Sequence, residues 1–171
     1  MKPFFLLFTV LLSSVYISAQ NTDTTTITKI GDPMPHFNFE LTQEKQSSIQ
    51  DYKGKVILIN LFATWCSPCA KELPEVQKNI WEKYQNNKNF ALFVFGRDEG
   101  WDKLIPYKQR FGYTFPILPD VDKKIYSLFA TQYIPRNILI DKSGKIIYQS
   151  IGYDETEFKR LLKLIEKSIK E

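Results

Sequence analysis

The sequence predicts an α/β fold with a central mixed β-sheet flanked by helices. Two apolar runs rich in branched residues, 56–62 and 90–95, are typical of strands buried on both faces. Residues 67–84 lie between them and carry apolar side chains at helical spacing, which indicates a helix that connects parallel strands. Near the C-terminus, residues 136–140 and 145–150 flank a turn that contains glycine, so they predict an antiparallel hairpin.

The remaining elements follow from the same two periodicities. Residues 36–41 alternate apolar and polar and predict a half-buried strand, and residues 45–49 return as its partner in an N-terminal β-hairpin. Helices are expected at residues 101–111 and 121–129, and an amphipathic helix at residues 158–169. The chain shows no internal repeat and no linker, which favours a single domain.

Composition narrows the class of protein. Of the 171 residues, 43% are hydrophobic and 15% aromatic, which is enough for a packed core and excludes global disorder. The net charge is only +4 and no basic block stands out, so no nucleic-acid partner is predicted. The chain has two Cys and one His, which excludes a scaffold of many disulfides and leaves a four-ligand zinc site short of ligands.

The N-terminus has the pattern of a secretory signal peptide over residues 1–19. A basic start precedes an apolar run at residues 4–12, and small residues end the segment at Ala19. The run has about half of the ~20 apolar residues that a membrane span needs, so cleavage is favoured over an uncleaved membrane anchor. Residues 20–29 are expected to form a flexible leader and residues 30–171 the folded domain. Both alternatives place the domain outside the cytoplasm, in a periplasm or an equivalent compartment.

Cys66 and Cys69 are the candidate reactive residues. Cys66 follows a buried strand and precedes a helix, where free N–H groups and the helix dipole favour an anion such as a thiolate. A Cys66 thiolate can attack a substrate disulfide, and Cys69 can then attack the mixed disulfide and release the reduced substrate. Ser67 and Pro68, which separate the two cysteines, are placed to tune the reduction potential.

Three other roles compete for the pair. A structural disulfide over this spacing closes a very short loop, so it removes little chain entropy. A zinc site would need carboxylates to complete it, because His36 is the only histidine; no metal is therefore predicted. Inert buried thiols fit poorly with the place between strand and helix and with the adjacent Trp65. A redox-active pair is the favoured interpretation, and it needs no other cofactor.

Two separated motifs resemble the thioredoxin superfamily. Residues 54–74, which contain Trp65-Cys66-Ser67-Pro68-Cys69, resemble the active-site segment of its extracytoplasmic TlpA/ResA branch. Residues 133–141, which contain Ile134-Pro135, resemble a second motif of that branch in the expected order. The resemblance covers the chain from about Ile30 to the C-terminus. It implies a thioredoxin-like fold with an N-terminal β-hairpin and a central insertion at residues 101–120.

The resemblance also implies roles for individual residues. Pro135 is expected to follow a cis peptide bond and to face the cysteines, and the Ile134 backbone to pair with an extended substrate. Asn60 stands where cytoplasmic thioredoxins carry a buried Asp that assists proton transfer, and Asn cannot exchange a proton there. Glu72, one helical turn after Cys69, is the candidate substitute; the alternative is a solvated helix residue.

Residues near the pair have less specific signals. Trp65 is expected to form part of a substrate platform, with half-buried packing as the alternative. Ser67 and Pro68 are counted with it as substrate-binding residues. Arg136 is expected on the surface, with a positive rim of the cleft as the alternative. Residues 97–99 follow a strand end, where α/β proteins gather ligands, but a polar loop is an equal interpretation.

The resemblance implies an extracytoplasmic thiol-disulfide oxidoreductase. Its expected substrates are exported proteins with disulfides or thiols, as in cytochrome c maturation, and its expected electron donor is a membrane thiol protein. A monomer is expected. The alternatives are a disulfide oxidant or isomerase, and a redox-inactive binding module with the same fold.

Overall fold

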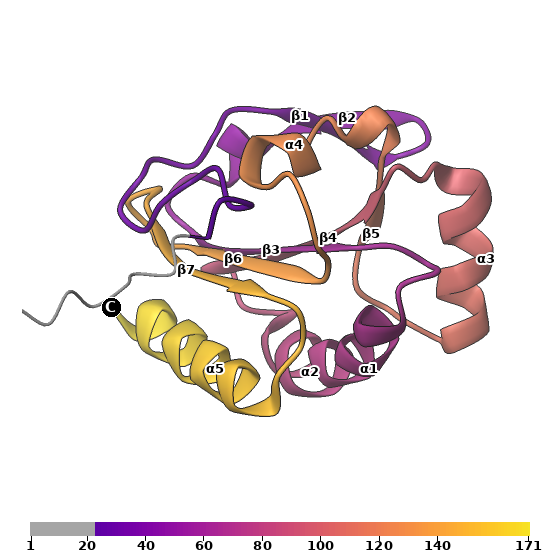
Figure 1. Ribbon diagram of the computed structural model, residues 1–171. Coiled ribbons are helices and arrows are strands. Elements are labelled where there is room, and N and C mark those ends of the chain that lie inside the picture. The colour runs from indigo at the N-terminus through magenta and orange to yellow at the C-terminus, as the bar shows by residue number, and fades with distance from the viewer. Residues whose placement is uncertain (1–22) are drawn as a thin grey trace, which may run out of the picture.

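The protein is described by a computed structural model over residues 23–171, which form a five-stranded mixed sheet and a separate two-stranded sheet (Figure 1). The strands are β1 (Asn38–Thr42), β2 (Lys45–Ser48), β3 (Val56–Phe62), β4 (Phe90–Arg97), β5 (Ile117–Asp120), β6 (Arg136–Ile140) and β7 (Ile146–Ile151). The helices are η1 (Ile49–Tyr52), α1 (Ser67–Val76), η2 (Gln77–Trp81), α2 (Glu82–Tyr84), α3 (Trp101–Phe111), η3 (Val121–Lys123), α4 (Tyr126–Phe129) and α5 (Glu155–Lys170). The strand order in the larger sheet is β5-β4-β3-β6-β7.

Strand β3 is the centre of the sheet, and every one of its residues is buried. It pairs in parallel with β4 and antiparallel with β6. Its branched apolar side chains suit a strand that packs on both faces. The predicted α/β fold with a mixed sheet and an N-terminal hairpin of β1 and β2 is therefore confirmed.

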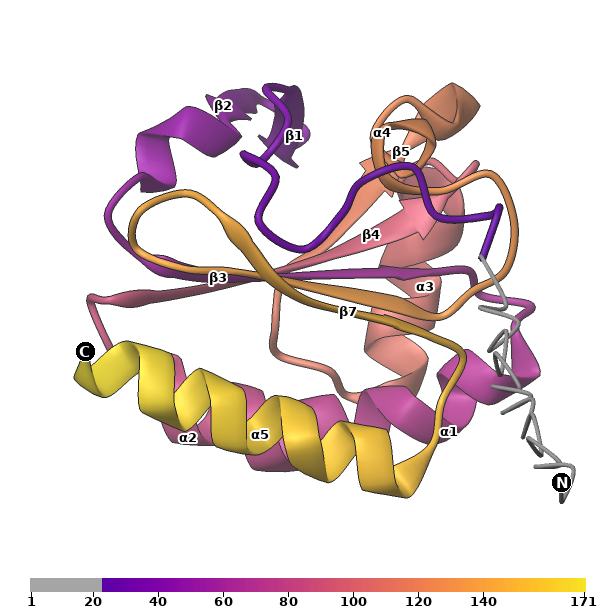
Figure 2. The ribbon, with the colours of Figure 1, turned by 60° about the vertical axis from the view of Figure 1, so that its left-hand side comes forward.

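Two layers cover the sheet. Helices α1, α2 and α5 lie against one face, and the β1–β2 hairpin and α4 lie against the other (Figure 2). Leu58 of β3 belongs to the first core, together with Leu73 of α1 and Leu161 of α5. Ile59, the next residue of β3, belongs to the second core together with Phe129 of α4, because successive strand residues point to opposite faces.

The sequence prediction differs from the structure around β5. Within residues 101–120, expected as a central insertion, the predicted helix is confirmed as α3, whereas the edge strand β5 beside β4 was not predicted. Pro119 interrupts the strand pattern, and an edge position tolerates it because one side of the strand needs no ladder partner. The single helix expected at residues 121–129 is broken, since Asp122 has a left-handed backbone with φ of 59°. The Asp120 carboxylate accepts the Ile125 N–H at 2.7 Å, close to the start of α4.

The first part of the described chain is bound to the domain. Thr26 forms a β-bridge with Ala130, and the Ile27 N–H donates to the Phe129 carbonyl at 2.9 Å. Residues 23–29 thus differ from the flexible leader expected there. The predicted signal peptide at residues 1–19 lies outside the described residues. Within residues 23–171, no helix combines the length and the apolar character needed to cross a membrane.

Gly96 of β4 allows α3 to pack close to the sheet. A Cβ atom on residue 96 would lie 2.5 Å from Cδ2 of Leu104, which is 1% exposed. Such overpacking of a core typically costs about 1–3 kcal/mol. We therefore expect Gly96→Ala to lower the free energy of unfolding by about that amount, measured by urea denaturation.

A double-mutant cycle with Leu104→Ala provides the control. Alanine at position 104 removes the methyl groups that the new Cβ would meet. Gly96→Ala should therefore cost much less in the Leu104→Ala background than in the wild type. An equal cost in both backgrounds would contradict the close contact as the cause.

Candidate active site

The chain turns sharply between the end of β3 and the start of α1. Cys66 is the N-cap of α1, and Ser67 and Pro68 are its first two residues. Proline suits this first turn because the N–H that it lacks would have no helical partner there. Cys66 is 5% exposed and Cys69 is fully buried, and a disulfide joins them. The pair therefore has one sulfur near the surface and one sealed behind it.

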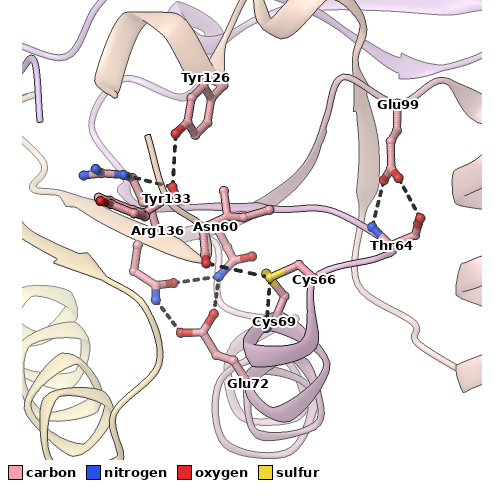
Figure 3. The surroundings of a disulfide bond; sticks show 11 residues. Asn60, Thr64, Cys66, Cys69, Glu72, Glu99, Tyr126, Tyr133 and Arg136 are labelled. Atoms are coloured by element: carbon pink, nitrogen blue, oxygen red, sulfur yellow. Dashed lines mark hydrogen bonds between the residues drawn. A yellow bond between two sulfur atoms is a disulfide. The ribbon is translucent and has the colours of Figure 1, made fainter. Parts of the chain in front are cut away.

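The start of α1 can stabilise negative charge on Cys66. The Cys69 N–H donates to Cys66 Sγ at 3.2 Å, as an N-cap side chain accepts from the first turn (Figure 3). Once the disulfide is reduced, the same N–H and the helix dipole favour a thiolate at this sulfur. Cys66 is consequently the better nucleophile of the two, and Cys69, which is fully buried, is placed to attack it from within.

A loop from a distant part of the sequence faces the pair. The Ile134–Pro135 bond is cis, as the resemblance implies, and the Ile134 carbonyl oxygen lies 3.7 Å from Cys66 Sγ. Trp65 and Tyr133 are 68% and 62% exposed. An exposed Trp65 fits the expected substrate platform better than half-buried packing does.

Glu72 is buried below the pair in a hydrogen-bonded network. Its side chain accepts from Asn60 Nδ2 at 2.9 Å and from Asn137 Nδ2 at 2.5 Å. Asn60 Nδ2 also donates to Asn137 Oδ1 at 2.9 Å, which closes the network. Because Glu72 is 1% exposed, the alternative of a solvated helix residue is wrong. Figure 3 shows Asn60 and Glu72 close together beside Cys66 and Cys69.

Burial changes the acidity of Glu72. Loss of solvent around the carboxylate raises the pKa of Glu72 to about 7, against the opposing effect of the hydrogen bonds from Asn137 and Asn60. A carboxyl group with this pKa can take up or release a proton near neutral pH. Glu72 lies one helical turn after Cys69 on α1, and its exchange of a proton with the buried thiol stays a prediction.

Two other charged residues near the site are buried, which the sequence did not reveal. Arg136 was expected on the surface or at the rim of a cleft, but it is 2% exposed, so both expectations are wrong. Glu99 is also buried, and its carboxylate accepts the Thr64 N–H at 3.0 Å and the Thr64 hydroxyl at 2.6 Å. These bonds hold the turn that leads to Cys66, so the polar loop at residues 97–99 supports the site.

Asn137 is the residue of the site that sequence reasoning missed. It lies two residues after Pro135 in the second motif, and only its pairing opposite Asn60 in the sheet reveals its contact with Glu72. A polar residue inside an otherwise apolar strand is the signal that could have found it. Among residues 23–171, no three His, Cys, Asp or Glu side chains gather closely enough to hold a metal ion.

The fold and this site together define a class of protein. The central strand of a mixed sheet leads to a helix that begins with a Cys-x-x-Cys sequence. A loop with a cis-proline places a backbone carbonyl near the outer sulfur. An accessible sulfur backed by a buried partner is the arrangement for thiol–disulfide exchange. The molecule is therefore a thiol-disulfide oxidoreductase with a thioredoxin-like fold.

Comparison with known proteins agrees and gives the family. The Redoxin family matches residues 29–165, so the chain belongs to the Redoxin family. The thiol-disulfide oxidoreductase ResA of Bacillus thuringiensis (strain Al Hakam) is 31% identical over 129 residues, which are 75% of this chain and 73% of that protein. ResA of Bacillus subtilis is 28% identical over 119 residues, 68% of this chain and 64% of that protein. Within the thioredoxin superfamily the chain is thus ResA-like.

Solved structures show the same fold. A solution structure from Bacteroides thetaiotaomicron, provisionally described as a protein disulfide isomerase, matches with a TM-score of 0.82 and 36% identity. The match covers 86% of this chain and 94% of that one. A Chlorobium tepidum protein, provisionally described as the thiol:disulfide interchange protein DsbE, matches with a TM-score of 0.71 and 22% identity, over 82% of this chain and 98% of that one.

The acidity of Glu72 predicts how stability depends on pH. Between its ordinary pKa of 4.5 and about 7, the folded protein holds a proton that the unfolded chain has released. The free energy of unfolding must therefore fall as pH rises through this window, by about 3 kcal/mol from this group. We expect Glu72→Gln to remove this fall, measured by urea denaturation from pH 4.5 to 8.

The matched control is Glu82→Gln, which removes an exposed carboxylate from α2. Its pH dependence should follow that of the wild type. The quantity to compare is the change in the free energy of unfolding with pH, not its absolute value. The amide introduced by Glu72→Gln offers only one acceptor oxygen to the two asparagines, and this alone would shift the absolute stability. A slope for Glu72→Gln equal to that of the control would contradict the elevated pKa.

Proposed function

We propose that the protein works outside the cytoplasm as a reductant of disulfides in exported proteins, for example in cytochrome c maturation. The observation that carries the proposal is the position of Cys66 at the start of α1, within 3.7 Å of the Ile134 carbonyl. A substrate that reaches this sulfur also reaches the loop beside it. The signal-peptide pattern at residues 1–19 supports the location, and the likeness to ResA, a thiol-disulfide oxidoreductase, supports the class of reaction.

The first step forms a mixed disulfide. In the reduced protein, the Cys66 thiolate attacks one sulfur of a substrate disulfide, and the second substrate sulfur leaves as a thiolate that takes up a proton. The Ile134 backbone, next to Pro135, is expected to pair with the extended substrate segment. Trp65, Ser67 and Pro68 are exposed next to Cys66 in the chain and are expected to contact the same segment.

The second step releases the substrate. Cys69 loses its proton and attacks Cys66 Sγ. The bond between Cys66 and the substrate breaks, and the substrate sulfur that was attacked in the first step leaves as a thiolate with the electron pair of that bond and takes up a proton. We assign Glu72 as the group that takes the Cys69 proton, because its pKa of about 7 suits it to this transfer. The products are a reduced substrate and the Cys66–Cys69 disulfide seen in the structure.

The Cys66–Cys69 disulfide must then be reduced again by another molecule. The sequence of the protein contains two cysteines only, so no third thiol relays electrons within the chain. We propose a membrane thiol protein as the electron donor and a monomer as the working form. No cofactor is proposed beyond the cysteine pair, because the two thiols carry both electrons.

A disulfide isomerase or oxidant is the second candidate. The 36% identical protein from Bacteroides thetaiotaomicron, provisionally described as a protein disulfide isomerase, favours it. Isomerisation uses the same Cys66 attack but lets a substrate thiol, not Cys69, resolve the mixed disulfide. The choice between the candidates therefore depends on the stability of the Cys66–Cys69 disulfide.

Single cysteine variants test the roles of the two sulfurs. We expect Cys69→Ser to accumulate a mixed disulfide with a protein substrate, because Cys66 still attacks and nothing resolves the product. Cys66→Ser should form none, and both variants should lose insulin-disulfide reduction in the presence of dithiothreitol. Non-reducing gels measure the adduct. An equal yield of adduct from both variants would contradict the assignment of Cys66 as the attacking thiol.

The reduction potential decides the direction of electron flow. Equilibration with glutathione or dithiothreitol buffers, followed by alkylation of free thiols, measures it. A reductant should have a reduction potential of about −270 mV, as thioredoxin has, whereas the reduction potential of a strong oxidant is about −120 mV. A value close to the latter, together with reactivation of scrambled ribonuclease, would favour the second candidate over the proposed one.

A further inference from the structure

A buried arginine follows the proline of the site. Arg136 is the first residue of β6, pairs with Leu61 at the end of β3, and is 2% exposed. The hydrogen bonds of its guanidinium group all run to carbonyl or hydroxyl oxygens. These oxygens belong to two segments far apart in the sequence, the loop just before Pro135 and the first residues of the described chain. The side chain therefore connects the two segments.

On the loop side, Arg136 fixes two successive carbonyl groups. Its Nη2 and Nε donate to the Gln132 carbonyl at 2.7 and 3.0 Å, and Nε also donates to the Tyr133 carbonyl at 3.2 Å. The Tyr126 hydroxyl donates to the same Tyr133 carbonyl at 3.1 Å (Figure 3). Tyr133 has a φ of 65°, a left-handed conformation that is unfavourable for a residue with a Cβ. These bonds hold that conformation directly before Ile134.

On the other side, the same guanidinium binds two threonines. Nη1 donates to Thr26 Oγ1 at 2.7 Å, and Nη2 donates to Thr25 Oγ1 at 2.7 Å and to the Thr25 carbonyl at 3.2 Å. The Thr131 N–H also donates to the Thr25 carbonyl, at 2.9 Å. The planar fork of an arginine can serve both segments at once, whereas a lysine ammonium is a single point charge.

A carboxylate orients the two threonine hydroxyls. Thr25 Oγ1 donates to Asp23 Oδ1 at 2.6 Å, and Thr26 Oγ1 donates to Asp23 Oδ2. Each hydroxyl has one proton, and giving it to Asp23 leaves only lone pairs to face Arg136. The hydrogen bonds from Thr25 and Thr26 lower the pKa of Asp23 to about 2, so Asp23 remains a carboxylate at neutral pH. The two hydroxyls thus connect the Asp23 carboxylate to the buried guanidinium by hydrogen bonds.

We propose that Asp23, Thr25, Thr26 and Arg136 form a brace that positions the loop at residues 132–135 for substrate docking. The brace residues are positioning residues, because they touch the loop and not the sulfurs. The proposal rests on the docking of substrates beside Cys66 proposed above. It makes the first residues of the described chain part of the active-site support, although they lie 40 or more positions before Cys66 in the sequence.

The test uses a pair of isosteric substitutions. Thr25→Val with Thr26→Val removes both hydroxyls from the brace and keeps the branched shape. We expect the KM for insulin to rise about tenfold with kcat little changed, because the loop loses its fixed position and docking weakens. Reduction of the Cys66–Cys69 disulfide by dithiothreitol should proceed at the wild-type rate, since a small thiol does not need the loop.

Amide hydrogen exchange measures how firmly the loop is held in the absence of substrate. The amides of Tyr133, Ile134 and Arg136 should exchange at least about tenfold faster in the double variant than in the wild type. Thr24→Val is the matched control, because Thr24 is exposed and outside the brace. Asp23→Asn, at an exposed position, is a second variant that should show the same changes to a smaller extent.

The outcomes separate this proposal from the proposed function. Loop exchange and KM values equal to those of Thr24→Val would overturn the brace, and so would an equal slowing of insulin and dithiothreitol reactions. If the wild type fails to reduce insulin, the proposed function is lost, and the exchange rates of the loop amides still decide for or against the brace.

Discussion

The antiparallel pairing of β3 with β6 is the constraint on which the site depends. Its register sets Leu61 opposite Arg136 and Asn60 opposite Asn137. The first pair brings the proline loop to the end of β3, beside Cys66. The second pair puts two amides side by side on the face that α1 covers, where both reach Glu72. A slip by one residue would send Asn137 to the opposite face of the sheet, so the register positions both the loop before Pro135 and the amides that surround Glu72.

The two cysteines differ in their exposure to solvent. The N-cap position gives Cys66 an N–H donor and an opening to the surface, while Cys69 is sealed one turn further along. In the proposed mechanism Glu72, which is also buried, takes the proton of this sealed thiol. The two asparagines make that possible for Glu72, because they satisfy the carboxylate without neutralising it. The pKa that results is the compromise between lost hydration and retained hydrogen bonds.

The loop opposite the cysteines needs support of its own. Tyr133 adopts a left-handed conformation in front of Ile134, and such a backbone persists only where the surroundings hold it. The contacts of Tyr126 and Arg136 provide this support from inside the domain. Glu99 gives comparable support to the turn at Thr64, on the other side of the sulfurs. The exposed reactive surface is thus held by buried polar side chains on both sides.

Every strand except β5, most of the helices and the position of the cysteine pair could be predicted from the sequence, because they follow from the local periodicity of apolar residues and from a motif. The resemblance of the second motif also predicted the cis bond between Ile134 and Pro135, which the structure confirms. The burial of Glu72 and Arg136, the contact of Asn137 with Glu72 and the extension of the sheet by β5 became visible in the folded structure alone. The reason is that these properties depend on partners remote in the chain: Asn137 and Glu72 are 65 residues apart, and Arg136 and Thr26 are 110 residues apart. Whether a charged side chain is solvated or buried depends on such partners, and no local pattern records them.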